Sequence, residues 1–244
     1  MSKHSYLSIK KYLICLVSII SILFMTLALI GLGFWQLHRY HYKKQLLLRY
    51  VQAKEHPVMT LSGLLHARHQ QFMPLRVSGE VITKKAIWVE NDLRDGNGYH
   101  LIVPLRVDGH QPWLLVNFGW LPAHAGHQQP KMPALSAHAL KGHVRFPQKL
   151  PWLIGKNIRN PGQFPLEIQS LDMKETQKVL DHALFPFVLY LDPDTASAFK
   201  RNFVITTVTP KRHLIYAIQW FLFAIIFLLG SVLLIKKRRH KYEA

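Results

Sequence analysis

The residues best suited to chemistry begin at His213, at the mouth of a long apolar segment. From Leu214 to Ile235 the chain has 22 residues without a formal charge, and about 20 apolar residues suffice for an α-helix to cross a membrane. At helical spacing, an aromatic or small residue, an indole and a second small residue fall on the side of His213. These residues are Tyr216 or Ala217, Trp220 and Ala224.

A second group of such residues follows the other long apolar segment, Leu13 to Trp35, which has 23 residues without a formal charge. Gln36 and Arg39 come directly after it, and paired spans would bring them to the depth of Arg212 and His213. An imidazole, aromatic faces and cations at one depth could hold the iron, ring and propionates of a porphyrin. The same residue types also form an ordinary interfacial belt of aromatic and basic side chains. Residue types alone leave both interpretations open.

The two apolar segments also organise the chain. Its 31 Lys and Arg residues against 13 Asp and Glu give a formal net charge of +18, and basic residues crowd both ends. Basic flanks stay in the cytoplasm, so the region between the spans is expected on the opposite side. The predicted order is a cytoplasmic tail (1–12), a transmembrane helix (13–35), a juxtamembrane helix (36–56), an extracytoplasmic β-rich domain (57–212), a second transmembrane helix (213–235) and a basic cytoplasmic tail (236–244).

The tails and the composition also narrow the location and the partners. The first apolar segment is too long for a signal-peptide core, and its short N-terminal flank is no Arg-rich transit peptide. We therefore expect a bacterial inner membrane, with the central domain in the periplasm. The excess of positive charge suits anionic membrane lipid or acidic partners, whereas no motif typical of nucleic-acid binding accompanies it. Cys15 is the only cysteine, which excludes disulfides within the chain.

The central region carries strand signals, rich in Val, Ile, Leu and aromatic residues. In Tyr99–Val107, alternate residues from Leu101 to Val107 form one apolar face, and Pro104 predicts an edge strand or a bulge. Asp172 resembles the cap of a helix that runs to about Leu184. The fold class expected is a mostly antiparallel, barrel- or sandwich-like sheet between two membrane helices. The predicted strands are Phe72–Val81, Ala86–Asn91, Tyr99–Val107, Pro112–Trp120, Gly142–Phe146, Phe187–Leu191 and Phe203–Thr209.

Hydrolytic and metal chemistry in the central region have little support. The pairs His66/His69 and His124/His127 have a spacing that could share a helix face, but they fall in predicted loops without carboxylates at ligand spacing. No Gly-x-Ser-x-Gly elbow is present in the sequence, and its one cysteine lies inside an apolar run. We therefore expect a protein that is not an enzyme.

Five segments, spread over nearly the whole chain, resemble those of one protein family. This is the Surf-one (Shy-one) family of cytochrome c oxidase assembly factors. The segments are Leu32-Gly33-Phe34-Trp35-Gln36-Leu37-His38-Arg39, Gly98-Tyr99-His100, Val116-Asn117-Phe118-Gly119-Trp120-Leu121-Pro122, Asn160-Pro161-Gly162 and His213-Leu214-Ile215-Tyr216-Ala217-Ile218-Gln219-Trp220-Phe221.

The resemblance implies an inner-membrane protein that assists the maturation of oxidase subunit I, with heme a synthase as a further partner. Bacterial relatives are thought to bind heme a near the second span, so the resemblance makes His213 the metal ligand. Phe118 is a departure, because the family usually has Arg at that position. The implied cofactor-binding residues are His213, Tyr216, Trp220, Trp35, Gln36, Arg39 and Arg212.

Three functions remain for such a protein. The first is a membrane-bound chaperone that receives heme a and delivers it to subunit I. The second is a cofactor-free scaffold that stabilises oxidase assembly intermediates. The third is a sensor, which would need a signalling partner because few residues follow Ile235. The visible spectrum of the purified protein separates the first from the second.

Overall fold

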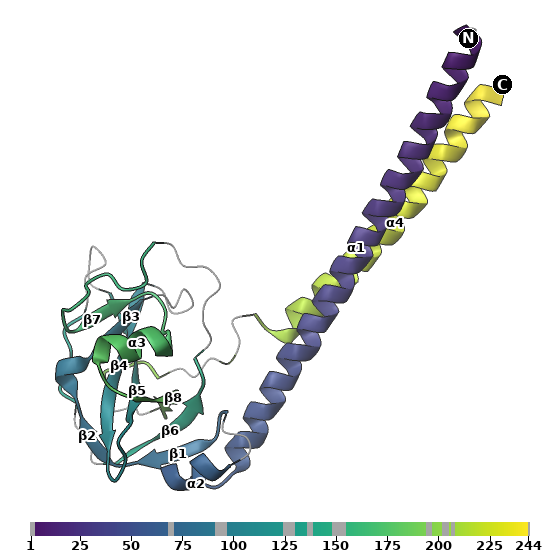
Figure 1. Ribbon diagram of the computed structural model, residues 1–244. Helices are drawn as coiled ribbons and strands as arrows, with labels where there is room; N and C mark the ends of the chain where they lie inside the picture. The colour runs from purple at the N-terminus through teal and green to yellow at the C-terminus, as the bar shows by residue number, and fades with distance from the viewer. Residues whose placement is uncertain are drawn as a thin grey trace. The chain divides into compact units, whose positions relative to one another are not determined.

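The computed structural model describes residues 3–67, 71–90, 97–123, 130–135, 139–147, 155–193, 197–201, 205 and 208–243. Its chain divides into two compact units, which are coloured by residue number in Figure 1. One unit, Met1–Leu47 with Thr206–Ala244, is a pair of long helices. The other, Leu48–Ile205, is a sheet domain.

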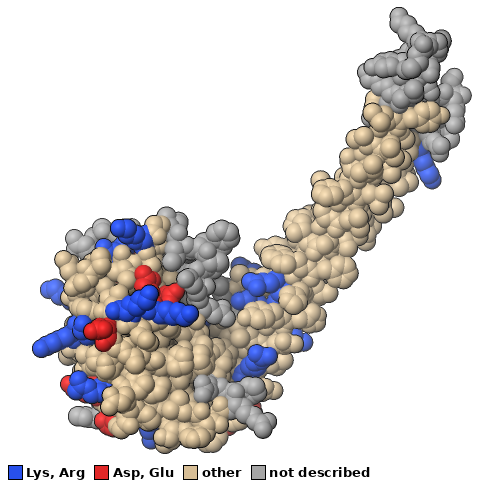
Figure 2. Space-filling model, viewed as in Figure 1, with Lys and Arg blue, Asp and Glu red and all other residues tan. Residues whose placement is uncertain are grey.

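The helical unit is built from α1 (Lys3–Glu55) and α4 (Pro210–Glu243). Both helices are long and apolar enough to cross a membrane. Their apolar side chains are largely exposed, as at Leu27 (62%) and Leu233 (66%), which suits lipid contact rather than a soluble core. In Figure 2 most of the helix surface carries neither acidic nor basic side chains. We conclude that the chain is a membrane protein with two candidate spans.

Helix α1 is longer than either helix predicted in this part of the sequence. The expected transmembrane helix 13–35 and juxtamembrane helix 36–56 are parts of one helix of 53 residues. It ends at Glu55, two residues before Pro57, because a proline disfavours helix in the residue before it.

In the described residues, the sheet domain has eight strands in one sheet. Their order is β1-β6-β8-β5-β4-β3-β7, and β2 pairs with the C-terminal end of β4. Two pairs, β5 with β8 and β3 with β7, are parallel, and the others are antiparallel. The strands are β1 (Pro74–Val77), β2 (Gly79–Val81), β3 (Ile87–Glu90), β4 (Gly98–Val107), β5 (Trp113–Pro122), β6 (Leu140–Arg145), β7 (Leu166–Ile168) and β8 (Leu184–Leu191).

The expected fold class, a barrel- or sandwich-like sheet domain flanked by two long apolar helices, is confirmed, and the sandwich-like form is the one that fits. The sheet is open, because β1 and β7 end the pairing order in the described residues. Isolated bridges shield both ends: Met59 pairs with Leu75 beside β1, and Ile158 pairs with Ile168 beside β7. Covered edges of this kind protect a sheet from pairing with another chain.

Two hydrophobic cores lie on opposite faces of the sheet. The larger includes Trp88, Tyr99 and Phe187 and is joined by α2 (Leu61–His66). The smaller core is covered by α3 (Met173–Leu180) and β7. Strand β4 supplies Leu101, Val103, Leu105 and Val107 to the first core and Ile102 to the second. The predicted alternation in β4 is therefore confirmed.

Pro104 lies in a central strand, so its predicted place at an edge is wrong. The predicted bulge exists, between Leu101 and Ile102 where β4 pairs with β5. The carbonyl of Pro104 accepts a hydrogen bond from the amide of Ile82, with an N–O distance of 2.8 Å. The nitrogen of Pro104 points to the same side, where the 3-10 turn η1 (Thr83–Lys85) interrupts pairing between β2 and β3. The missing N–H therefore costs no ladder bond there.

Other local predictions were right in type but differed in extent. The Asp172 carboxylate accepts from the amides of Lys174 (2.9 Å) and Glu175 (3.3 Å), as a cap should, but α3 ends at Leu180 because Asp181 turns left-handed. The predicted strand Phe72–Val81 breaks between β1 and β2, which pair with different partners. Helix α2 and strand β7 were not predicted, because both are too short to show a period. The predicted strand Phe203–Thr209 and the residues His69, His124 and His127 lie wholly or largely outside the described residues.

The last turns of α1 pack within the sheet domain through Tyr50. Its ring contacts Phe72 edge-on at 5.6 Å and lies 6.0 Å from the ring of His143. The Nδ1 atom of His143 is 2.9 Å from Oδ1 of Asp192. Burial lowers the pKa of His143 below its usual value, and Lys54 adds to this, while Asp192 opposes it.

His143 should therefore make the sheet domain less stable in acid. The folded pKa lies below the unfolded value of 6.5, so the unfolded chain takes up the proton first and stability falls as pH drops below about 6.5. We expect the urea midpoint of the full chain in detergent to fall from pH 7 to pH 5, and to fall less in His143→Gln. The exposed His56 gives the matched control, since His56→Gln should keep the wild-type slope; an unchanged slope in His143→Gln would contradict the assignment.

Candidate functional site

Small residues let α1 and α4 pack closely. In the described apolar segments of the two helices, the buried residues are small: Thr26 and Gly33 on α1, and Ala217 and Ala224 on α4. The two residues on each helix are seven positions apart. A Cβ at Gly33 would lie 2.5 Å from a ring atom of Phe221. Small residues that admit close approach are the usual basis of helix association in membranes. The seven-residue spacing keeps them on one face of each helix.

Gly33 should therefore be intolerant of a large side chain. Gly33→Leu forces the ring of Phe221 to move, and overpacking of this kind costs about 1–3 kcal/mol. We expect the two helices to separate or rotate, which spin labels at the exposed positions Leu27 and Ile225 would report as a changed distance in a Cys15→Ser background. Gly31→Leu is the matched control, because nothing lies within 4 Å of a Cβ there. Equal distances in both variants would show that Gly33 does not set the packing.

The central feature of the helix pair is a hydrogen bond between His213 and Gln36. Nδ1 of His213 lies 2.8 Å from Oε1 of Gln36, and both side chains are partly buried. Gln36 is one turn from Gly33, so the close packing of the helices brings the two polar side chains within reach of each other. The positive charges of Arg39 and Lys43 are near enough to interact electrostatically with the ring of His213. Three of the predicted site residues, His213, Gln36 and Arg39, therefore lie near one another.

The other predicted site residues have different surroundings. Trp220 is partly buried, and its ring lies 6.1 Å from that of Phe223. Trp35 and Tyr216 are 54% and 46% exposed, and Arg39 and Arg212 are exposed too. Either Tyr216 or Ala217 was expected on the side of His213. Ala217 is the one that is buried in the helix pair, whereas Tyr216 is exposed. The predicted stripe is therefore His213, Ala217, Trp220 and Ala224, with aromatic side chains on the surface beside it.

The arrangement at His213 fits a metal ligand. With the amide oxygen of Gln36 as the acceptor, Nδ1 of a neutral ring carries the hydrogen and Nε2 keeps its lone pair. A histidine whose second nitrogen is held by a neighbour is the usual form of a metal-binding imidazole. A protein-only metal site is a different matter, since the described residues contain no group of three or more His, Cys, Asp or Glu placed to hold an ion. Iron carried by a porphyrin needs just one or two such ligands.

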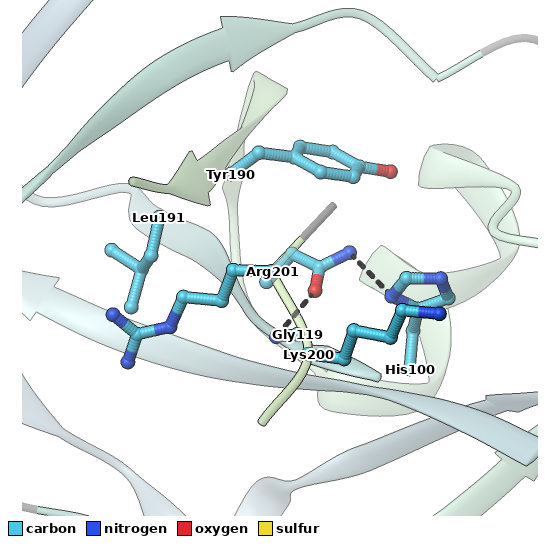
Figure 3. A pocket seen from close by; sticks show the side chains of 7 residues that line it. His100, Gly119, Tyr190, Leu191, Lys200 and Arg201 are labelled. Carbon is cyan, nitrogen blue, oxygen red and sulfur yellow. Dashed lines mark hydrogen bonds between the residues drawn. The ribbon is translucent and has the colours of Figure 1, made fainter. Parts of the chain in front are cut away.

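A second cluster of motif residues lies in the sheet domain and lines a pocket shown in Figure 3. His100 comes from β4, and Asn117 and Gly119 come from β5. Lys200 and Arg201 follow in a segment whose backbone pairs with Trp120, with N–O distances of 2.9 Å. The pocket is completed by Tyr190 and Leu191 of β8. Two segments of the family resemblance thus meet at one place.

The pocket is small, and two cationic side chains, Lys200 and Arg201, line it. The amide oxygen of Asn117 accepts from the amide of Gly119 at 2.9 Å, and its nitrogen lies 3.4 Å from Nδ1 of His100. Arg201 donates to the backbone carbonyls of Phe118 (3.0 Å) and Asp192 (3.1 Å). The cavity volume is about 10 Å³, room for roughly one water molecule. A porphyrin does not fit there.

Sequence reasoning missed part of this pocket. Tyr190, Lys200 and Arg201 belong to no quoted motif, and the parallel pairing of β5 with β8 that brings Tyr190 in leaves no local signal. Phe118 stands where the family usually has Arg, and its side chain is buried in the larger core beside Phe199. The guanidinium that reaches this part of the strand comes from Arg201 instead.

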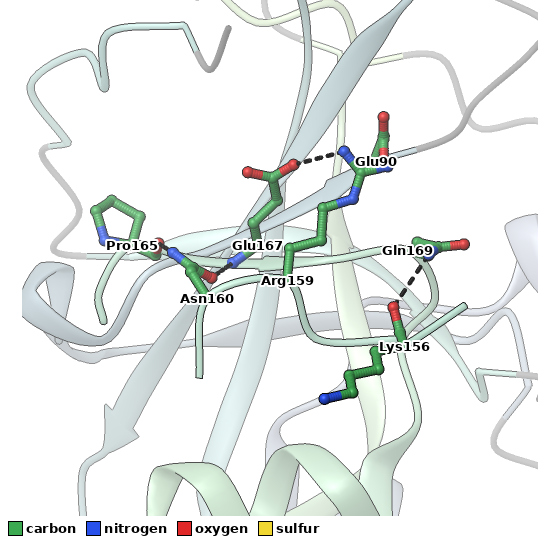
Figure 4. A network of polar contacts seen from close by, with 7 residues as sticks. All are labelled: Glu90, Lys156, Arg159, Asn160, Pro165, Glu167 and Gln169. Carbon is green, nitrogen blue, oxygen red and sulfur yellow. Dashed lines mark hydrogen bonds and ion pairs between the residues drawn. The ribbon is translucent and has the colours of Figure 1, made fainter. Parts of the chain in front are cut away.

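The third motif, Asn160-Pro161-Gly162, has a structural role (Figure 4). The Asn160 side chain donates to the carbonyl of Pro165 (3.0 Å) and accepts from the amide of Glu167 (2.7 Å), which ties the loop to β7. Arg159 forms ion pairs with Glu90 and Glu167. The buried Tyr99 lies beside this network. Burial raises its pKa, and the two carboxylates raise it further.

The family comparison covers both units. A family model, that of the SURF1 family, matches residues 23–225. No curated protein sequence matches the chain. The matched range includes the paired helix segments at Gln36 and His213 and all three motifs of the sheet domain, so this protein belongs to the SURF1 family of cytochrome c oxidase assembly factors.

Proposed function

We propose that this protein binds heme a at its helix pair and delivers it to cytochrome c oxidase subunit I as a membrane-bound chaperone. The observation that carries the proposal is the hydrogen bond between His213 and Gln36, which leaves the other imidazole nitrogen as a ligand for iron. The family supplies the assembly role. The heme and its route to the oxidase are our proposal.

The surroundings of His213 supply the other groups that a heme needs. Aromatic side chains of Trp220, Tyr216 and Trp35 lie partly or well exposed on the same two helices, where a flat apolar ring can stack on them. Arg39 and Arg212 are exposed cations that can pair with propionates or with lipid headgroups. A site on the surface of the pair, rather than in a closed cavity, suits a carrier that has to release its cargo.

The proposal includes a location and two partners. We place the protein in the bacterial inner membrane, with both termini in the cytoplasm and the sheet domain in the periplasm. Lys and Arg flank each apolar segment on the side nearer its chain terminus, and such basic flanks stay in the cytoplasm. Heme a synthase would supply the cargo and subunit I would receive it. A reporter enzyme active solely in the periplasm, fused after residue 120, should be active; activity of a cytoplasmic reporter at the same site would reverse the orientation.

The visible spectrum of the purified protein tests the function. Protein from cells that make heme a should show a Soret band, and protein from the same cells without heme a synthase should lack the heme a spectrum. A colourless protein that still supports oxidase assembly would refute the carrier and favour the cofactor-free scaffold. Measured turnover of a heme precursor would refute both and indicate an enzyme.

A further inference from the structure

We infer that Gln36 is a positioning residue, which holds His213 in the tautomer that offers Nε2 to iron. The inference rests on the proposed heme site and names the atom that binds there. Gln36 itself need not touch the heme. Its amide oxygen accepts the Nδ1 hydrogen, and this single contact decides both the ring orientation and the nitrogen that remains free to coordinate.

The geometry of the bond supports this role. The two residues are 177 positions apart in sequence and come from different helices, so the contact depends on the packing of α1 against α4. Nδ1 and Oε1 are 2.8 Å apart, a short distance for a neutral N–H···O bond. The helices also approach each other closely at Gly33 and Phe221, one turn away. The ring therefore makes its Nδ1 contact in a closely packed part of the helix pair.

The surroundings explain why an amide suits this position. The polar side chain lies at the end of an uncharged run of α1, where an unpaired polar group costs free energy. A glutamine is neutral, so it orients the ring without adding a charge beside Arg39 and Lys43, both of which act on His213. Leucine has a comparable size but cannot accept a hydrogen bond. Glutamate keeps the acceptor but adds a charge.

The expected consequence is a loss of preorganisation. In Gln36→Leu the imidazole can rotate and exchange its hydrogen between the two nitrogens, so part of the population presents a protonated nitrogen to iron. Loss of such a neighbour weakens metal binding by about 10- to 100-fold in known sites. We expect a decrease of that order in heme affinity. Gln36→Glu should retain the tautomer and most of the affinity, because its carboxylate accepts from Nδ1–H.

Nitrogen NMR on the heme-free protein tests the inference directly. The full chain, labelled with ¹⁵N-histidine and placed in lipid nanodiscs at pH 8, should show His213 protonated at Nδ1, with the signal identified by its loss in His213→Ala. The signal should become a mixture of tautomers in Gln36→Leu, persist in Gln36→Glu, and persist in Gln45→Leu, which removes an exposed glutamine of the same helix.

The outcomes separate the inference from the proposed function. A wild-type ring protonated at Nε2, or a tautomer unchanged in Gln36→Leu, would overturn the positioning role even if the protein binds heme. If the tautomer depends on Gln36 but the wild-type protein takes up no heme a, the positioning of the ring stands as described and the heme chaperone is refuted instead.

Discussion

Replacing His213 with alanine should remove heme a from the purified protein while leaving the protein in the membrane. The substitution deletes the imidazole that we assign to iron and the bond to Gln36, but it does not touch the packing of Gly33 against Phe221. Alanine is also the residue of highest helix propensity. We expect the heme a content, read from the Soret band per mole of protein, to fall by at least about tenfold, because even the loss of a residue that only orients a metal ligand weakens metal binding this much.

His41 provides the control for this experiment. It is an exposed histidine of α1 whose ring contacts Tyr40 at 5.0 Å. His41→Ala should keep the wild-type heme content. Equal heme contents in His213→Ala and the wild-type protein would contradict the assignment of the ligand, and equal losses in both variants would show that histidine number rather than position matters.

Replacing Gly119 with alanine should produce a large loss of stability in the sheet domain. Gly119 has a φ of +123°, and a Cβ there would lie 2.8 Å from Cβ of Phe199 and 3.0 Å from the carbonyl oxygen of Lys200. Backbone strain of about 1–3 kcal/mol and overpacking of about 1–3 kcal/mol add to roughly 2–6 kcal/mol. The pocket should also change shape, because a Cβ at Gly119 would lie 3.0 Å from Cγ of Arg201, which lines the pocket with it. The unfolding midpoint in urea, read on the full chain in detergent, measures the loss.

Gly109 separates the two contributions. It also has a positive φ, +73°, but nothing lies within 4 Å of a Cβ there. Gly109→Ala should therefore cost just the backbone strain, about 1–2 kcal/mol. A cost for Gly119→Ala no larger than that for Gly109→Ala would mean that segment 199–201 does not pack against β5 as described.

The helices were predictable from the sequence because their signal is local. Uncharged runs of 22 and 23 residues define α4 and the first part of α1 without any tertiary information. The union of two predicted helices into α1 was harder, since the change from apolar to polar residues at Gln36 marks the end of the apolar run but not of the helix. Hydropathy reports the environment of a helix, whereas its end is set by Pro57.

The sheet was predictable in its strands but not in its pairing. Alternation in β4 showed which residues face one core. Nothing local shows that β5 lies between β4 and β8, or that β7 pairs in parallel with β3. Such pairs join segments far apart in the chain, and their register depends on packing of the whole sheet.

The candidate site was predictable where membrane depth fixes position. Both Gln36 and His213 adjoin the ends of apolar runs, so the membrane restricts them to one level, and the structure adds the 2.8 Å contact. Depth leaves rotation about the helix axis open. The inward turn of Ala217 and the outward turn of Tyr216 therefore had to come from the packing of small residues.

Rescue by a free ligand tests the central claim most directly, which is that the His213 imidazole binds the iron of heme a. In His213→Gly the lost side chain leaves space for an imidazole supplied in the buffer. We expect a colourless variant that takes up added heme a, and so regains a protein-bound Soret band, when imidazole is supplied together with the heme, but not when heme a is supplied in buffer without imidazole. A variant that keeps its heme a without imidazole, or that no concentration of imidazole restores while its helix pair stays folded, would contradict it.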